Sequence, residues 1–366
     1  MRIPFERGTL MLKVRRCLDQ VREYRSPAPD PALVLRLDLN ESTTGCSPRV
    51  LTKMRTLDAK TLALYPPREP GEEMIAEFLG IKASETLLTN GADEAIDLLC
   101  RAFLEPDGEI IVVTPAFNMY EIFAQSTGAT TVRIPAGADF SFPIDKIVAA
   151  INPRTRIVVV TNPHNPSGTV AQRDDIYRVL KAAPEAAVLL DEAYFDFYGE
   201  TMMHEIGKVT NLFVARTFSK AYGLAGMRLG VLAGPAEHIS VIRRMTSPFN
   251  VNVFALECLA EALADTEFIS NLVKQVRTTR GWLQRELEML GFHCWPSQAN
   301  FVLVNFGDLR PTILSAMTAQ GIALRDRPDI PGCVRISIGT QAEMEHVVAV
   351  LKQSVSESPV AHQVVR

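Results

Sequence analysis

The sequence is poor in the features that mark metal, secreted and membrane proteins. Its six cysteines are scattered without a CxxC pair, and its six histidines show no HExxH or similar spacing. We therefore expect free thiols in a reducing compartment and no metal site. The first seven residues, MRIPFER, lack an apolar run of secretory type, and no apolar segment approaches bilayer length. The sequence predicts a cytoplasmic protein that makes no membrane contact.

Basic residues are not in excess, and the usual dinucleotide fingerprint is missing. The chain has 38 lysines and arginines against 42 acidic residues, a net charge of −4, whereas a nucleic-acid partner usually requires a basic surface. No GxGxxG opens the first strand–helix unit, which argues against a nicotinamide-dependent enzyme. With 366 residues, 47% of them apolar, the chain is long enough for two compact lobes.

Short apolar runs alternate with helical patterns through the middle of the chain, as is typical of a parallel sheet covered by helices. The runs are residues 110–113, 157–160, 187–190 and 212–215. Two later runs, 301–304 and 334–338, predict strands of a smaller α+β lobe, and the helical pattern over 268–290 predicts a bridge into it. Ligands gather at the carboxyl ends of parallel strands, so polar residues that follow these runs are site candidates.

The segment TFSKAYGLAGMRLG, residues 217–230, carries the most informative pattern. Lys220 stands beside small hydroxyl residues, and Arg228 follows eight positions later. A lysine amine forms a Schiff base with an aldehyde, and hydroxyls with an arginine suit a phosphate monoester. Pyridoxal phosphate (PLP) is a cofactor that carries both groups. The segment therefore predicts a PLP site, with a solvated surface loop as the alternative.

Other polar residues at predicted strand and helix ends would complete such a site. Asp191 follows the run 187–190, where a carboxylate can pair with a protonated pyridine nitrogen, unless it is a helix N-cap. Asn165 lies in the loop NPHNPSG, whose prolines hold the backbone rigid, and its amide can donate to a phenolate oxygen. Gly91 stands at a helix start, which offers free N–H groups to a phosphate or is simply a helix cap.

Three more residues suit the ring and the substrate. Phe117 follows the run 110–113 and can stack on a flat ring, with Tyr120 or plain packing as alternatives. Arg335 is a charge inside an apolar strand, so it requires an anionic partner, either a substrate carboxylate or an internal ion pair. Arg325 is a candidate for a second anion contact, unless Asp326 or solvent satisfies it.

Together these residues resemble the fold-type I PLP-dependent aminotransferases of classes I and II, specifically their histidinol-phosphate aminotransferase-like branch. The resemblance runs from residue 40 to 351 and is carried by NE (40–41), LYP (64–66), NGADE (90–94), NPSG (165–168), DEAY (191–194), SK (219–220) through Arg228, and VRI (334–336). It implies an α/β fold with a mostly parallel seven-stranded sheet sandwiched by helices. It also implies a large PLP domain over 45–260 and a small α+β domain built from 1–44 with 261–366.

The resemblance implies a role for each matching residue. Lys220 is expected to bond to the cofactor and move the substrate proton, and Asp191 to pair with the pyridine nitrogen. The remaining cofactor contacts it implies are Asn165 and Tyr194 to the ring oxygen, Phe117 on the ring face, and Gly91, Ala92, Asp93, Thr217, Ser219 and Arg228 at the phosphate. The substrate contacts it implies are Arg335, Arg325, Tyr24 and Asn40. Tyr65 matches a tyrosine that reaches the phosphate of a neighbouring subunit, so we expect a homodimer with shared active sites.

The chain departs from the branch near the substrate entrance. After Asn40 and Glu41 the branch usually continues with Asn, Pro, an aromatic and Gly, whereas this chain has STTG at 42–45, and Phe117 stands where tyrosine is common. We expect an aminotransferase that moves an amino group between an acidic or phosphorylated compound, such as histidinol phosphate, and 2-oxoglutarate. The alternatives are an aromatic amino acid aminotransferase, a PLP-dependent lyase or decarboxylase on the same scaffold, and a non-catalytic PLP-binding module.

Overall fold

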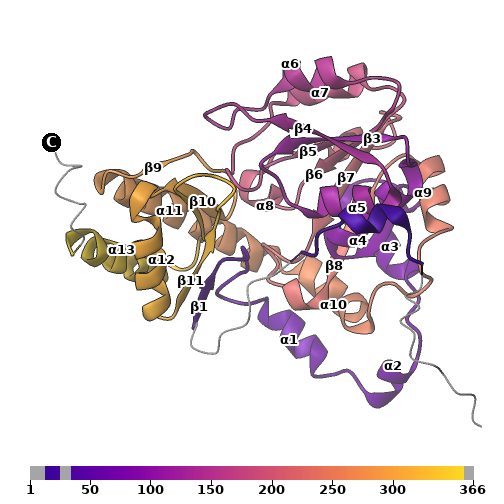
Figure 1. The fold of residues 1–366 in the computed structure, drawn as a ribbon. Helices are drawn as coiled ribbons and strands as arrows, with labels where there is room; N and C mark the ends of the chain where they lie inside the picture. The colour runs from indigo at the N-terminus through magenta and orange to yellow at the C-terminus, as the bar shows by residue number, and fades with distance from the viewer. Residues whose placement is uncertain (1–12, 25–33, 358–366) are drawn as a thin grey trace, which may run out of the picture.

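The computed structural model describes residues 13–24 and 34–357 and shows two layered units (Figure 1). The strand order of the larger sheet is β2 (Thr86–Asn90), β8 (Leu229–Ala233), β7 (Leu212–Thr217), β6 (Ala187–Asp191), β5 (Thr155–Thr161), β3 (Glu109–Thr114) and β4 (Thr130–Pro135). Neighbouring strands are parallel, except that β8 runs antiparallel to both β2 and β7. This confirms the mostly parallel seven-stranded sheet, and the four apolar runs of its predicted strands are β3, β5, β6 and β7.

Helices cover both faces of this sheet. Successive strand residues point to opposite sides, so a continuous apolar run presents apolar side chains on both faces. On one face α4 (Gly91–Phe103), α5 (Met119–Thr127) and α9 (Ala236–Arg243) pack on strand residues such as Val112 and Leu189. On the other face α6 (Ile144–Ala150) and α7 (Arg173–Ala182) pack on Ile111 and Val158. Burial on both faces explains why the strands are continuous apolar runs and do not alternate with polar residues.

The smaller unit contains a five-stranded sheet that joins the two ends of the chain. Its order is β1 (Leu35–Leu37), β11 (Ile322–Asp326), β12 (Cys333–Ser337), β10 (Phe301–Asn305) and β9 (His293–Cys294). β1 pairs parallel with β11, and the other pairs are antiparallel. Figure 1 shows β1 as an indigo strand among orange and yellow ones, so the segment after residue 34 is held beside the C-terminal strands.

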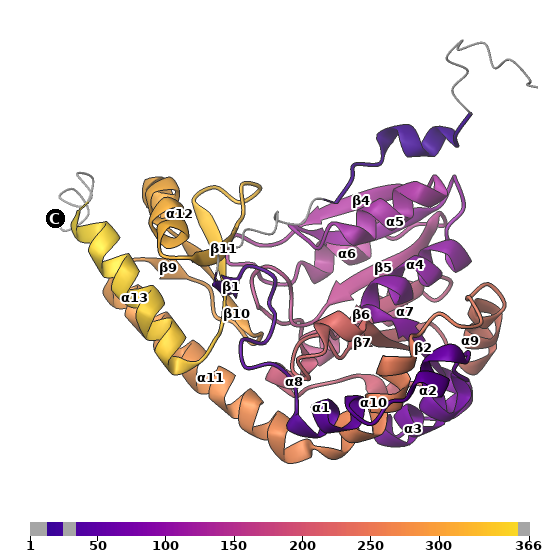
Figure 2. The ribbon, with the colours of Figure 1, turned by 90° about the horizontal axis from the view of Figure 1, so that it is seen from below.

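A long helix, α11 (Thr266–Met289), links the two units. Figure 2 shows it running from α10 (Val253–Ala264) along one side of the molecule, with α13 (Gln341–Ser356) further along the same side. It buries Leu272, Val276, Leu283 and Leu287, which recur at the spacing of one helix face. The Asp265 carboxylate accepts from the Phe268 N–H and caps the helix start. The helix predicted over 268–290 is thus confirmed, with its ends shifted by one or two residues.

The other elements complete the two units. The remaining α-helices are α1 (Pro48–Met54), α2 (Ala59–Ala63), α3 (Glu69–Leu79), α8 (Phe195–Tyr198) and α12 (Arg310–Ala319). The short 3-10 helices, labelled η, are η1 (Arg16–Gln20), η2 (Ala83–Glu85), η3 (Met203–Glu205), η4 (Ala225–Met227) and η5 (Gly307–Leu309). The segment around η1 lies against α5, where Arg15 donates to the Thr127 carbonyl at 3.2 Å. No helix in the described ranges is long and apolar enough to cross a membrane.

Candidate active site

A cavity of about 710 Å³ opens where the parallel strands of the larger sheet end. β11 and β12 of the smaller unit line its other side. The predicted residues on its wall are Tyr24, Asn40, Ala92, Asp93, Phe117, Asn165, Asp191, Tyr194, Thr217, Ser219, Lys220, Arg228, Arg325 and Arg335. Gly91 begins α4 immediately before Ala92, whereas Tyr65 does not line the cavity and has a 78% exposed side chain. The fold therefore brings together, from both units, nearly every residue that the sequence predicts.

Lys220 lies just after the end of β7 and holds its amine within the cavity wall. Its Nζ donates to the Leu39 carbonyl at 2.9 Å. Burial is the main cause that lowers the pKa of Lys220 from 10.5 to about 8, and the nearby Arg335 charge contributes to this lowering. Near neutral pH the neutral amine that attacks an aldehyde is therefore more abundant than it would be for an ordinary lysine.

Asp191 is the last residue of β6, and both of its carboxylate oxygens accept hydrogen bonds. Oδ1 accepts from the Ala193 N–H at 2.9 Å and Oδ2 from the Tyr120 hydroxyl at 2.5 Å. Burial raises the pKa of Asp191, while the Tyr120 hydrogen bond lowers it. Asp191 caps no helix among the described residues, because α8 begins only at Phe195 with Tyr194 at the N-cap position. Its carboxylate instead lines the cavity, where it can pair with a cationic ring nitrogen.

Tyr194 and Asn165 belong to a buried polar network that reaches the smaller unit. The Tyr194 hydroxyl accepts from Asn40 Nδ2 at 3.0 Å and from Asn165 Nδ2 at 3.4 Å. Asn40 is 1% exposed and has a left-handed backbone, with φ of 56°. Its backbone N–H donates to Ser337 Oγ, and this hydroxyl donates to the Leu37 carbonyl at 2.8 Å. Asn40, predicted as a substrate contact, therefore also holds the Tyr194 phenol in place.

The start of α4 and the segment after β7 form an anion pocket. Thr217 Oγ1 donates to Ser219 Oγ at 2.9 Å, and Arg228 Nη2 lies 3.0 Å from Asp93 Oδ2. A Cβ atom at Gly91 would lie 2.5 Å from Arg228 Nη2, so only glycine lets the guanidinium approach the helix start this closely. Helix N–H groups, two hydroxyls and a guanidinium are the contacts that a phosphate prefers.

Arg325 and Arg335 stand opposite each other on β11 and β12. Arg335 is 6% exposed, and it donates to Asn165 Oδ1 at 2.6 Å and to the Asp38 carbonyl at 2.7 Å. Burial is the main cause that lowers the pKa of Arg335 to about 10, and the nearby arginines contribute to this lowering. Its Nε has no hydrogen-bond partner within the described part of the chain. The Arg335 guanidinium thus keeps one buried N–H group without an acceptor in this part of the chain.

The acidic side chains near these arginines pair with other cations. Asp326 lies 3.5 Å from Arg310, and Asp329 pairs with Arg327 at 2.5 Å. Across residues 13–24 and 34–357, neither Arg325 nor Arg335 forms an ion pair with a carboxylate. The internal ion pair considered for Arg335 and the Asp326 contact considered for Arg325 are therefore not formed within these ranges. Both arginines line the cavity without a paired carboxylate among the described residues.

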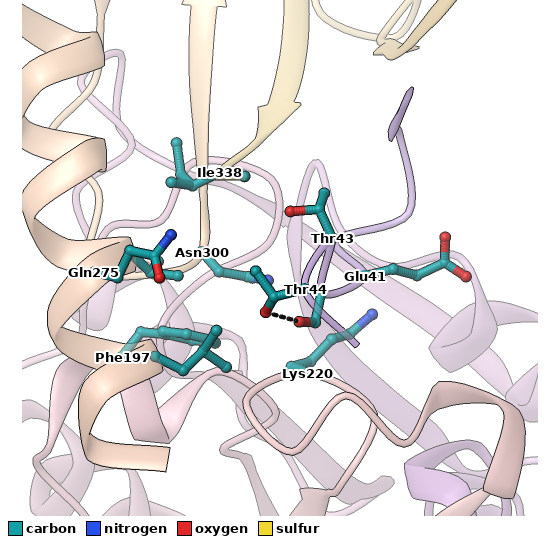
Figure 3. Close-up of a pocket in the computed structure, with 12 residues that line it drawn as sticks. Glu41, Thr43, Thr44, Phe197, Lys220, Gln275, Asn300 and Ile338 are labelled. Carbon is teal, nitrogen blue, oxygen red and sulfur yellow. Dashed lines mark hydrogen bonds between the residues drawn. The ribbon is translucent and has the colours of Figure 1, made fainter. Parts of the chain in front are cut away.

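A second, much smaller pocket also has Lys220 in its wall (Figure 3). Its volume of about 10 Å³ admits about one water molecule. Ser42 and Thr44 share a hydrogen bond of 3.1 Å beside it, and Thr43 Oγ1 donates to Glu343 Oε2 at 2.6 Å near the start of α13. The segment in which the sequence departs from the branch therefore lines this small pocket, outside the wall of the large cavity.

The structure adds residues that the sequence did not single out. Tyr120 was considered only as an alternative ring-stacking residue, yet it is fully buried and donates to Asp191. Thr161, the last residue of β5, lies 3.0 Å from the same hydroxyl. The available signal was weak: Tyr120 comes three residues after Phe117, at the start of α5, and thus close in sequence to a predicted ring contact. The Phe117 and Tyr120 rings meet edge to face, with centroids 5.9 Å apart.

Known proteins are similar to this chain over most of its length. Residues 33–351 match the model of the family described as aminotransferase class I and II. The chain is 34% identical to the histidinol-phosphate aminotransferase of Akkermansia muciniphila, over 88% of this chain and 91% of that protein. It is 33% identical to the histidinol-phosphate aminotransferase of Methanococcoides burtonii, over 87% and 89% of the two chains.

A solved structure gives the same result for the fold. The crystal structure of histidinol-phosphate aminotransferase from Sinorhizobium meliloti in complex with pyridoxal-5'-phosphate matches with a TM-score of 0.83. It is 22% identical in sequence, and the match covers 94% of this chain and 98% of that one. The donor set described above fits PLP, because a buried amine, a buried carboxylate, phenol and amide groups and an anion pocket share one cavity.

Sequence, fold and cavity therefore agree on an amino-group-transferring enzyme, which sets aside the lyase and the non-catalytic binding module. The chain belongs to the class I and II aminotransferases, PLP-dependent enzymes of fold type I, and within them to the histidinol-phosphate aminotransferase-like branch.

Proposed function

We propose that this aminotransferase moves an amino group between a phosphorylated donor of the histidinol phosphate type and 2-oxoglutarate. The observation that carries the proposal is the pair of Arg325 and Arg335. Two guanidinium groups on neighbouring strands repel each other unless an anion lies between them. A substrate phosphate, or the second carboxylate of an acidic acceptor, supplies that anion through charge-assisted hydrogen bonds. The names of the two relatives from Akkermansia muciniphila and Methanococcoides burtonii support the same donor.

Lys220 performs the proton transfer in this proposal. PLP, when bound, supplies the electron sink that stabilises negative charge on the substrate carbon. Lys220 provides the amine that holds the cofactor and then accepts and returns the substrate proton at Nζ. Its lowered pKa, about 8, keeps part of the amine neutral for this task. The Leu39 carbonyl orients Nζ from the segment that follows β1.

The other residues bind and orient. Asp191 holds a proton at the ring nitrogen, and Asn165 with Tyr194 positions the ring oxygen. The start of α4, with Thr217 and Ser219, anchors the phosphate of the cofactor. Because Arg335 donates to Asn165, the group that binds the acidic end of the substrate is tied directly to a group that holds the ring. Substrate binding and ring orientation are therefore coupled through one hydrogen bond of 2.6 Å.

We also propose a homodimer and a two-domain division at the boundaries predicted from the sequence. Tyr65 stacks on Phe249 with ring centroids 4.3 Å apart, and the two side chains are 78% and 48% exposed. Leu62 and Leu64 beside them are also more than half exposed. A cluster of exposed apolar side chains suits a protein partner. A second copy of this chain would cover it and receive Tyr65 at its own phosphate pocket.

A donor panel tests the substrate. Histidinol phosphate, phenylalanine, tyrosine, aspartate and arginine are each mixed with the PLP-loaded enzyme, and the single-turnover loss of visible cofactor absorption is timed. We expect histidinol phosphate to react best. Arg325→Gln should lower kcat/KM for histidinol phosphate about 10- to 100-fold, as expected for a lost hydrogen bond between charged groups, and leave phenylalanine nearly unchanged.

Arg178→Gln is the matched control, because Arg178 lies on α7, outside the cavity, and pairs with Asp145 at 2.5 Å. A best reaction with an aromatic donor would favour the aromatic amino acid aminotransferase, whose ring would meet Tyr24 and Phe117 on the cavity wall. An equal loss with every donor in Arg325→Gln would contradict the proposed phosphate contact.

A further inference from the structure

We propose that Tyr120 is a positioning residue for the ring nitrogen of PLP and acts through Asp191. The inference rests on the proposed role of Asp191 as the partner of that nitrogen. Tyr120 is the second residue of α5 and is fully buried, and its hydroxyl lies 2.5 Å from Asp191 Oδ2. This distance is typical of a hydroxyl that donates to a charged carboxylate.

The direction of each hydrogen bond follows from the available protons. Tyr120 has a single hydroxyl proton, which the ionised Asp191 carboxylate must receive because it can only accept. Thr161 Oγ1, 3.0 Å from the same oxygen, is therefore the donor to Tyr120. The chain Thr161 to Tyr120 to Asp191 joins the ends of β5 and β6 through the first turn of α5. These two hydrogen bonds hold the Tyr120 phenol in place and fix the orientation of Asp191 Oδ2.

The other carboxylate oxygen is fixed separately. Asp191 Oδ1 accepts from the Ala193 N–H at 2.9 Å, so each oxygen has one protein donor and retains further lone pairs. The carboxylate thus cannot rotate without losing a hydrogen bond. It lines the cavity with its remaining acceptor capacity, as a stationary partner for a ring N–H requires.

The Tyr120 hydrogen bond also opposes the effects that raise the pKa of Asp191 and favour its neutral form. Burial is the main factor that raises the pKa of Asp191, and the charges of Asp93 from α4 and of the adjacent Glu192 raise this pKa further. The hydrogen bonds from Tyr120 and Ala193 lower it. Burial, Asp191 and Tyr194 together hold the phenol pKa of Tyr120 well above its ordinary value, so the phenol stays a donor. An ionised Asp191 in turn favours the proton on the ring nitrogen.

The test removes only the donor. Tyr120→Phe keeps the aromatic packing, and we expect PLP to bind about tenfold more weakly to the apoprotein, measured by equilibrium titration. The pH at which binding is lost on acidification should rise by about one unit, because Asp191 then takes up its proton at a higher pH. Tyr177→Phe, which removes the same hydroxyl from a 37% exposed side chain on α7, should change neither quantity.

A double-mutant cycle with Asp191→Asn separates this inference from the proposed function. In the Asp191→Asn background, Tyr120→Phe should produce no further change in PLP affinity. It should also not shift the pH at which PLP binding is lost on acidification. If Asp191→Asn alone left PLP binding unchanged, the role proposed for Asp191 would fail. If Asp191→Asn weakened binding but Tyr120→Phe changed only the melting temperature, Tyr120 would have a merely structural role and the inference would be overturned.

Discussion

Lys220 combines burial with a neighbouring cation, and both act on its pKa in the same direction. Burial is the larger cause, Arg335 adds to it, and the acidic side chains of Glu41 and Asp93 oppose both. The resulting pKa of about 8 lies between that of an ordinary lysine and neutral pH. Arg335 therefore has two tasks in this account: it binds the acidic end of the substrate, and it helps to keep the Lys220 amine neutral.

The pH dependence of cofactor capture tests this coupling. Only the neutral amine attacks the aldehyde, so the rate of PLP capture by the apoprotein should rise with pH and level off above a midpoint of about 8. Arg335→Gln removes a cation, which raises the Lys220 pKa and should move the midpoint to higher pH. Stopped-flow absorption measures both. A midpoint near the ordinary value of 10.5 in the unmodified protein would contradict the assignment.

The sequence predicts most of the charged and hydroxyl side chains that line the cavity, because each follows a recognisable apolar run or loop motif. Tyr120 was not predicted as the partner of Asp191, since a buried aromatic on a helix is explained by packing alone. Its hydrogen bond joins positions 71 residues apart, a distance at which spacing carries no information. The exposed stack of Tyr65 and Phe249 likewise becomes visible only in three dimensions.

The ends of several secondary-structure elements meet at the site. β5, β6 and β7 end at Thr161, Asp191 and Thr217, and α4 begins beside them. The predicted runs that became β3, β5, β6 and β7 were recognisable because both faces of these strands are buried. β1 has only three residues, and its partner β11 lies almost 300 positions away, so no local period could reveal the pair.

The start of α4 provides a prediction at this scale. Gly91 has φ of 77°, so Gly91→Ala should lose about 1–2 kcal/mol of folding free energy through left-handed strain. Its new Cβ would also meet Arg228, which should weaken PLP binding about tenfold. Gly80→Ala is the control, because Gly80 has φ of 70° with no atom within 4 Å of an added Cβ. Thermal unfolding and PLP titration separate the two effects, and equal PLP affinity in both variants would refute the role of Gly91.

At the scale of the whole molecule, the cavity lies between the two units. The larger unit supplies Lys220 and Asp191, while the smaller supplies Arg325 and Arg335. Residues 13–24 lie against the larger unit, where Tyr24 meets Phe117 with ring centroids 6.2 Å apart. A change in the arrangement of the units would therefore change the separation between the cofactor contacts and the substrate arginines.

Subunit complementation tests the proposed homodimer. Lys220→Ala and Tyr65→Ala should each be nearly inactive alone, because each lacks one contribution to every shared site. When the two variants are unfolded and refolded together, mixed dimers contain one intact site, so partial activity should return. Sedimentation should show a dimer for the unmodified chain. A monomer with full activity would contradict the shared-site proposal.

The central claim is that one amine, on Lys220, bonds to PLP in the cavity opposite Asp191. The most direct measurement is to reduce the PLP-loaded protein with borohydride, digest it and locate the fixed cofactor by peptide mass spectrometry. We predict that the label lies on Lys220 and that the Lys220→Ala variant carries none. A label on a different lysine, or a cofactor that washes out after reduction, would contradict the account.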